Sequence, residues 1–201
     1  YVIPFLTELS EKLIQDKNNQ ALELDSLSDN IEHIKNIVTM QQSHTGSMGV
    51  VETLRASNVM DDAININLAS MGKYGIEVTR IYKDDPEIKV DKHKLMQVLV
   101  NLVSNAGHAL SDKKQDKHII TGIKKDGDSV VFYVEDNGVG IDKSDVTRVF
   151  EFGFKKRKGG HGYGLHHSAI MAKDLGGKIT VKSEGLGKGA RFELIIPTDL
   201  V

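Results

Sequence analysis

Glycine is distributed unevenly along this chain of 201 residues, and this distribution constrains the fold more than any other feature. The first 45 residues contain none of the 19 glycines, which all lie in the remainder. Because glycine destabilises helices and permits tight turns, the pattern predicts a long helical segment followed by a domain rich in turns. We therefore divide the chain into residues 1–46 and residues 47–201.

The helical segment carries an apolar seam whose members recur after three and four positions: Leu24, Leu27, Ile31, Ile34 and Val38. This spacing is typical of a packed or coiled helix. A helix of about 40 residues would be about 60 Å long, which exceeds the size of a small domain. We therefore expect residues 1–46 to form a dimerisation helix that pairs with a second copy in a homodimer. The alternative is a helix that packs on its own domain.

The bulk composition argues against several classes of function. The net charge is −2 and no cysteine is present, so nucleic-acid binding, disulfides and thiolate metal sites are not expected. No apolar run approaches the roughly 20 residues that span a bilayer, and we expect a cytoplasmic protein. The chain starts at Tyr1 rather than Met, so we expect any membrane contact to come from a segment that precedes it.

Apolar periodicity in residues 47–201 alternates between that of strands and that of helices. A period of two predicts strands at residues 49–53, 76–82, 118–124, 129–135, 178–183 and 190–196. Helical spacing predicts helices over residues 57–71, 92–109, 143–150 and 163–175. We therefore expect an α+β fold, a two-layer sandwich of a mixed sheet with helices on one face, preceded by the long N-terminal helix.

Two asparagines, Asn101 and Asn105, share one face of the predicted helix 92–109 because they are four positions apart. Asparagine is a poor helix former, so a pair of them within an apolar helix suggests a role. An amide oxygen is a suitable ligand for Mg²⁺. The alternative is that both amides form hydrogen bonds with neighbouring loops.

A second candidate site follows the predicted strand 129–135, where Asp136 precedes Gly138 and Gly140. The glycines allow the backbone to turn sharply and to approach a ligand closely. A carboxylate in this position can accept a hydrogen bond from an exocyclic amine such as that of adenine. Taken alone, the same residues also fit an ordinary Asp-Gly turn.

The third candidate is the glycine-rich run at residues 159–164, at the start of the predicted helix 163–175. Free backbone N–H groups at a helix start can bind phosphate. Four basic residues, 155–158, precede the run and would make a positively charged lid over a polyphosphate. The alternative is a solvated charged loop. The run lacks the Lys-Ser or Lys-Thr ending of a Walker loop.

Together with the turn at residues 187–189, these motifs in this order resemble the ATPase domain of histidine kinases. That domain belongs to the superfamily shared with gyrase, the heat-shock chaperone ATPases and the mismatch-repair ATPases. The resemblance covers about residues 50–197, and it implies the Bergerat ATP-binding fold with ATP and Mg²⁺ as cofactors. Residues 152–154 and 160–166 are similar to those of one subgroup of bacterial sensor kinases.

The resemblance also implies a role for each site residue. Asp136 would hold the adenine amine, and Asn105 would coordinate Mg²⁺ bound to the phosphates. His108 and Lys156 would contact phosphate as catalytic residues, and Asn101 would lie one turn before Asn105. The other implied contacts lie at the adenine end (Gly138, Gly140 and Ile141) and at the phosphate end (Gly160, His161, Gly162, Tyr163, Gly164 and Leu165).

We also expect Asn101 to be a catalytic residue, and its identity predicts which reaction the site favours. The hydrolysing relatives place a glutamate at this position as general base for water, and an amide cannot take that proton. We therefore expect slow ATP hydrolysis and transfer of the γ-phosphate to a histidine, and from there to a response regulator receiver domain. None of the eight histidines precedes an acidic residue. Because His33 lies in what resembles the second helix of the dimerisation hairpin, we expect the acceptor to lie before Tyr1.

Two other readings compete with a sensor kinase. A serine protein kinase of the anti-sigma or mitochondrial dehydrogenase-kinase type uses a similar ATP site, but the long helix ending in Gln41-Gln42 favours the sensor kinase. A degenerate domain that acts as a dimeric scaffold is disfavoured because every nucleotide-site residue is present.

Overall fold

The computed structural model describes residues 12–13, 15–17, 20, 50–111, 113, 115–154 and 162–199. The described residues before position 50 are helical. The rest of the expected dimerisation helix, its apolar seam and the domain boundary at residues 46 and 47 lie outside the described residues. The described residues from 50 onward belong to one compact unit.

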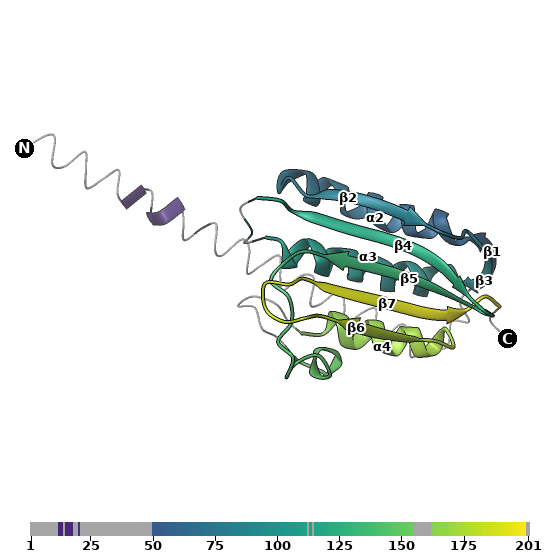
Figure 1. The fold of residues 1–201 in the computed structure, drawn as a ribbon. Coiled ribbons are helices and arrows are strands. Elements are labelled where there is room, and N and C mark those ends of the chain that lie inside the picture. The colour runs from purple at the N-terminus through teal and green to yellow at the C-terminus, as the bar shows by residue number, and fades with distance from the viewer. Residues whose placement is uncertain are drawn as a thin grey trace, which may run out of the picture. The chain divides into compact units, whose positions relative to one another are not determined.

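Five strands form the main sheet of this unit, in the order β2-β4-β5-β7-β6 (Figure 1). Their bounds are β2 Glu77–Tyr82, β4 His118–Asp126, β5 Ser129–Asp136, β6 Lys178–Lys182 and β7 Ala190–Pro197. Strand β2 runs parallel to β4, whereas the other neighbouring pairs are antiparallel. The sheet is therefore mixed, as predicted.

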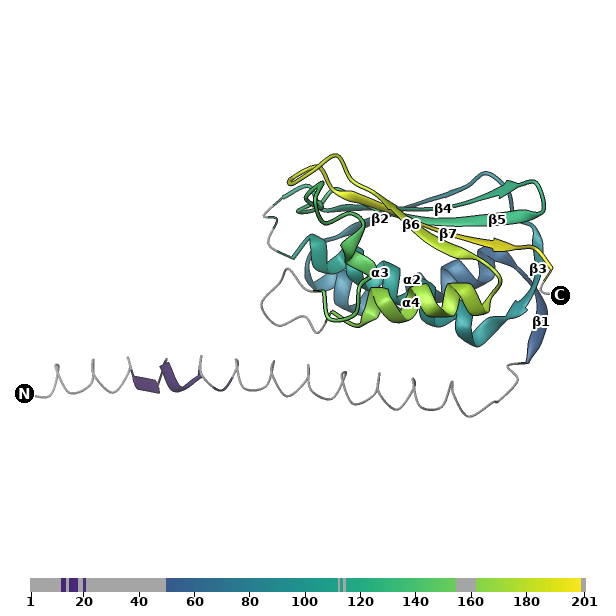
Figure 2. The same ribbon diagram turned by 90° about the horizontal axis from the view of Figure 1, so that it is seen from below.

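Three helices, α2 (Ala56–Lys73), α3 (Lys92–Ala109) and α4 (Gly164–Asp174), cover one face of the sheet (Figure 2). The central helix α3 buries the apolar residues whose spacing predicted it, namely Leu95, Val98, Leu99, Leu102, Val103 and Ala106. They join one core with Val130, Phe132 and Val134 of β5. Burial of each large side chain contributes about 1.5–3 kcal/mol, so this packing fixes α3 on the sheet. The α+β sandwich is thus confirmed for the described residues.

Three local elements differ from the sequence prediction. Strand β1, Val51–Arg55, begins two residues later than expected and pairs with an unpredicted strand, β3, Glu87–Asp91, in a separate two-stranded sheet. The expected helix over residues 143–150 is reduced to a short 3₁₀ helix, η1, Arg148–Phe150. The Asp142 carboxylate accepts a hydrogen bond from the Ser144 N–H at 2.9 Å, and such side-chain turns compete with helix.

We predict that the Asp91 side chain stabilises α3 as its N-cap. Its carboxylate accepts hydrogen bonds from the N–H groups of His93 and Lys94, both at 3.1 Å. Replacement Asp91→Ala should lower the free energy of unfolding by about 1 kcal/mol, measured by denaturant titration. The control Asp91→Asn keeps an acceptor oxygen and should lose less than half as much. Equal losses in both variants would contradict the assignment.

Candidate active site

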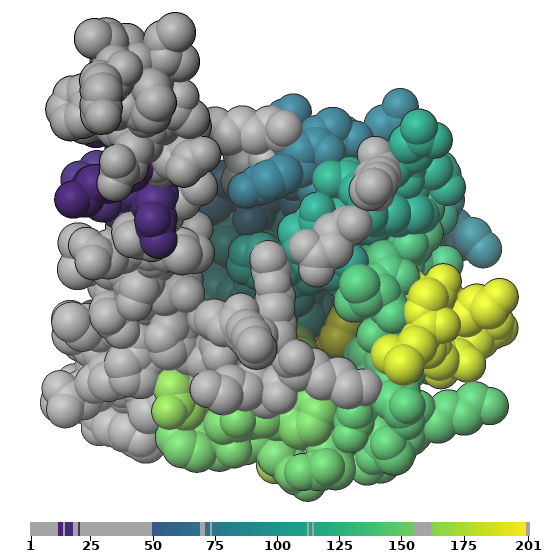
Figure 3. All heavy atoms as spheres, turned by 90° about the vertical axis from the view of Figure 1, so that its left-hand side faces the viewer, coloured from purple at the N-terminus to yellow at the C-terminus, as the bar shows by residue number. Residues whose placement is uncertain are grey.

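Four segments meet at one edge of the sandwich: the end of α3, the loop after β5, the β6–β7 turn and the start of α4. The Val139 N–H donates to the Ala109 carbonyl of α3 at 3.1 Å, and the Gly187 N–H donates to the Val139 carbonyl at 2.7 Å. Figure 3 shows this face, which is hollowed between teal, green and yellow segments. The three sequence motifs that are described therefore converge on one place.

Asp136 is the last residue of β5, and its side chain is buried, with 4% of the residue exposed. The strand lies between Ile119 of β4 and Ala190 of β7 at this register. One carboxylate oxygen accepts a hydrogen bond from the Gly138 N–H at 2.8 Å. Burial raises the pKa of Asp136 to about 6, although hydrogen bonds from the backbone of Gly138 and Ala190 act against the rise. A carboxylate is thus held in a place that disfavours its charge.

Gly138 is required by a close approach between the loop and α3. A side-chain carbon at this position would overlap the carbonyl of Ala109 and would lie 2.8 Å from the Asp136 carboxylate oxygen. The loop can therefore reach the end of α3 because residue 138 has no side chain. This contact also places the Gly138 N–H where it binds Asp136.

Asn101 connects α3 to the start of α4. Its side-chain amide donates a hydrogen bond to the Ser168 hydroxyl at 2.7 Å. A side-chain carbon on Gly164 would lie 2.6 Å from the Asn101 amide oxygen, so glycine permits the two helices to touch there. The structure therefore gives Asn101 a helix-to-helix contact beside the expected phosphate end.

Asn105 lies one turn further along α3, and its environment differs from that of Asn101. Its amide nitrogen is buried and has no hydrogen-bond partner among the described residues. An unsatisfied buried donor costs about 1–3 kcal/mol. A ligand that accepts a hydrogen bond from the Asn105 amide nitrogen would recover this energy. A phosphate oxygen can accept from the NH₂ group, and the amide oxygen is a ligand type that Mg²⁺ accepts.

The expected adenine-end residues Gly140 and Ile141 lie beside the β6–β7 turn. Gly140 abuts the carbonyl of Gly185, and the Ile141 N–H donates to the Ser183 hydroxyl at 3.0 Å. That hydroxyl in turn donates to the Gly189 carbonyl at 2.6 Å. The Ile141 side chain packs against the core, so this residue joins the loop to the sheet.

The phosphate end is described in part. Gly162, Tyr163, Gly164 and Leu165 lie at the start of α4, and Leu165 packs against the core. The Tyr163 ring lies 4.7 Å from the ring of Phe152, between centroids. His108 is exposed in the last turn of α3. Lys156, Gly160 and His161 lie outside the described residues, so their expected contacts stay predictions.

Sequence reasoning missed three polar residues of the site. Ser168 binds Asn101, Ser183 binds Ile141, and Asn137 binds His118 at the start of β4. Each contact joins residues at least 19 positions apart in sequence, which no local pattern reveals. Asn137 carried the clearest signal, because it stands between Asp136 and Gly138.

We predict that the Asp136 carboxylate lowers the stability of the unliganded fold at neutral pH. Its pKa rises from 3.8 to about 6 on folding. The charge-related stability is therefore fully present below pH 3.8 and lost as the pH rises through about 6. The neutral variant Asp136→Asn should raise the free energy of unfolding at pH 8 by about 1–3 kcal/mol.

This gain should vanish towards pH 4 in denaturant titrations at three pH values. The exposed Asp126 is the last residue of β4. Its replacement Asp126→Asn is the matched control and should change stability little at any of the three pH values. A destabilised Asp136→Asn protein at pH 8 would contradict the assignment.

Comparison with known proteins assigns these motifs to a family. The family described as histidine kinase-, DNA gyrase B-, and HSP90-like ATPase matches residues 90–200, more than half of the chain. A probable C4-dicarboxylate sensor kinase of Bacillus subtilis (strain 168) is 32% identical over 165 residues, covering 78% of this chain and 30% of the relative. The aerobic respiration control sensor protein ArcB of Escherichia coli (strain K12) is 35% identical over 117 residues, covering 55% of this chain and 14% of that protein.

The chain therefore spans less than a third of the length of these curated relatives. Among solved structures, full-length ShkA in complex with AMPPNP has a TM-score of 0.66 and 25% identity, covering 73% of this chain and 31% of that chain. The catalytic domain of histidine kinase ThkA has a TM-score of 0.66 at 20% identity, covering 76% and 99%, and shows the shared fold. This chain belongs to the histidine kinase-, DNA gyrase B- and HSP90-like ATPase family, and it contains the ATP-binding catalytic domain of a two-component sensor histidine kinase.

Proposed function

We propose that ATP binds with its adenine at Asp136 and its phosphates between Asn105 and the start of α4. The observation that carries this proposal is the buried Asp136 carboxylate, which has no ion-pair partner among the described residues. A buried charge without a partner is costly. The exocyclic amine of adenine is a donor that would satisfy the carboxylate, whereas the oxygen of a 6-oxopurine is not.

The start of α4 supports the placement of the phosphates. The Tyr163 side chain does not cap the helix, which begins at Gly164, and N–H groups in the first turn of a helix can bind an anion. The expected phosphate contacts of His108, Lys156, Gly160 and His161 belong to this proposal. Support also comes from ShkA, a structure of the same fold solved in complex with AMPPNP.

We assign the amide oxygen of Asn105 as the protein ligand of Mg²⁺. Among the described residues, no group of three or more His, Cys, Asp or Glu side chains could hold a metal ion. This fits Mg²⁺, which commonly binds through substrate phosphates with few protein ligands. When bound, the ion would neutralise charge that develops on the phosphates.

In the proposed reaction, a histidine nitrogen attacks the γ-phosphorus of ATP and the bond to the β–γ bridging oxygen breaks, releasing ADP. The protein contributes chiefly position and charge stabilisation. The Asn101 amide donates to Ser168 and cannot accept a proton from water. We therefore propose that Asn101 holds the start of α4 in place, and that the site hydrolyses ATP slowly.

The partners follow from the relatives. Their printed names describe a sensor kinase and a respiration control sensor protein. We propose that this chain acts as a homodimer through residues 1–46 and passes phosphate to a response regulator receiver domain in the cytoplasm. We assign the acceptor histidine to the dimerisation hairpin. Within the described part of the chain, no helix is both long and apolar enough to cross a membrane.

We predict that Asn105→Ala removes the strengthening of nucleotide binding by Mg²⁺ without destabilising the fold. The change removes a buried amide nitrogen that lacks a partner, and alanine favours helix more than asparagine. Calorimetric titration of a non-hydrolysable ATP analogue should show binding by the wild-type chain that strengthens with Mg²⁺. The variant should lose at least about tenfold in affinity with Mg²⁺ and melt at the same or a higher temperature.

The matched control is Asn67→Ala in α2, whose amide donates to the Ala63 carbonyl at 2.9 Å. It should melt at a lower temperature yet keep the Mg²⁺ effect. If Mg²⁺ still strengthens nucleotide binding in Asn105→Ala, then Asn105 is not the protein ligand of Mg²⁺.

A further inference from the structure

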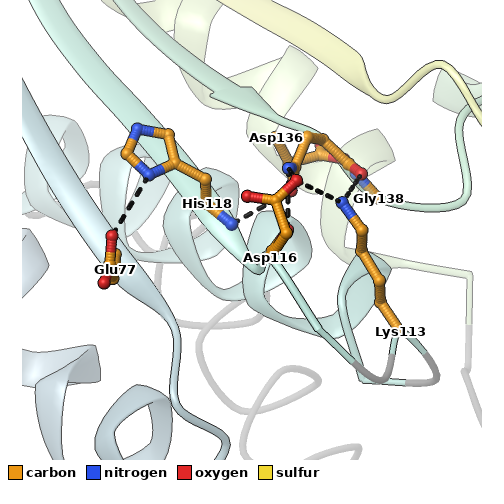
Figure 4. A network of polar contacts seen from close by, with 7 residues as sticks. Glu77, Lys113, Asp116, His118, Asp136 and Gly138 are labelled. Atoms are coloured by element: carbon orange, nitrogen blue, oxygen red, sulfur yellow. Dashed lines mark hydrogen bonds and ion pairs between the residues drawn. The ribbon is translucent and has the colours of Figure 1, made fainter.

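Asn137 stands between two residues of the adenine site, yet its polar atoms are all engaged elsewhere. Its side-chain oxygen accepts from the His118 N–H at 3.0 Å, and its side-chain nitrogen donates to the Asp116 carbonyl at 2.8 Å. Its backbone N–H donates to the His118 carbonyl at 3.3 Å, and its own carbonyl accepts from the Lys113 ammonium at 3.1 Å. Figure 4 shows this network around the end of β5.

These contacts hold the segment between α3 and β4 in an uncommon conformation. Asp116 has a φ of 54°, which costs a residue other than glycine about 1 kcal/mol. The Lys113 ammonium also lies 3.6 Å from the Asp116 carboxylate, but that side chain is 85% exposed, and exposed ion pairs contribute little. The half-buried Asn137 amide therefore contributes more than this ion pair to holding Asp116 and His118.

The same contacts continue the β4–β5 ladder past its last strand pair, Ile119 with Asp136. On its other side, the loop is held by α3, because the Val139 N–H donates to the Ala109 carbonyl. Residues 136–139 are thus fixed at both ends. Since the Gly138 N–H binds the Asp136 carboxylate, any movement of the loop would also turn the carboxylate.

We propose that Asn137 is a positioning residue that holds the Asp136 carboxylate towards the base and so sets the preference for adenine over a 6-oxopurine. This inference rests on the proposed role of Asp136. Lys113, bound to the Asn137 carbonyl, adds a nearby cation that lowers the pKa of Asp136 against the larger effect of burial. Asn137 therefore acts through Asp136, without contact with the nucleotide.

The test compares two nucleotides in three proteins by calorimetry at pH 8. The probes are a non-hydrolysable ATP analogue and its inosine counterpart, in which an oxygen replaces the 6-amino group. The wild type should prefer the adenine analogue. Asn137→Ala should weaken binding of the adenine analogue by at least about tenfold and that of the inosine analogue by less than about twofold.

The control Asn67→Ala makes the same chemical change in α2, outside the loop after β5, and removes an amide-to-carbonyl hydrogen bond of 2.9 Å. It should lower the melting temperature but keep the wild-type preference. If Asn137→Ala does not fold, Asn137→Asp serves instead, because it keeps the acceptor for the His118 N–H and loses the donor to Asp116. It should reduce the preference by at least about threefold.

The outcomes separate the two claims. Equal losses for both nucleotides, or an unchanged preference, in the Asn137 variants would overturn the positioning role while leaving Asp136 as the adenine residue. A wild-type chain that binds both nucleotides equally well would overturn the role of Asp136 and, with it, this inference.

Discussion

The site depends on one constraint, a carboxylate buried at the end of a central strand. Asp136 is 4% exposed and its pKa rises to about 6 because of burial. The fold keeps this unfavourable group through the Gly138 N–H and the backbone of Ala190. Because two neighbouring segments provide these groups, the loop after β5 and strand β7 must both be in place before the carboxylate is held. A ligand that donates a hydrogen bond to it would relieve the remaining cost.

Helix α3 contacts both the loop after Asp136, at the proposed base end, and the start of α4, at the proposed phosphate end. Its apolar face fixes it on the sheet, while its second half carries Asn101 and Asn105. Its Ala109 carbonyl accepts a hydrogen bond from the Val139 N–H in the loop that follows Asp136. Its Asn101 amide donates a hydrogen bond to the Ser168 hydroxyl of α4. In the proposed binding mode, this one helix would set the spacing between the two ends of the nucleotide. This explains why a strongly apolar helix tolerates two asparagines, each a poor helix former.

The sequence predicted what depends on local periodicity and missed what depends on distant contacts. The spacing of Leu95, Leu99 and Leu102 located α3. The sequence placed Asp136 just after an apolar strand, and the structure makes it the last residue of β5 and shows its burial, which the sequence did not predict. Strand β3 was missed because its five residues pair with another short strand outside the main sheet. The bond between Asn101 and Ser168 joins residues 67 positions apart, so only the packing of α4 on α3 reveals it.

The central claim, that Asp136 binds adenine, is tested most directly by the affinity of the chain for a non-hydrolysable ATP analogue with and without this carboxylate. Calorimetry on the wild type at pH 8 should give a dissociation constant below about 1 mM. Asp136→Asn replaces an acceptor oxygen by a donor with little change in shape and should show no measurable binding while remaining folded. Equal binding by the two folded proteins would contradict the account, and absence of binding by the wild type would favour a scaffold domain.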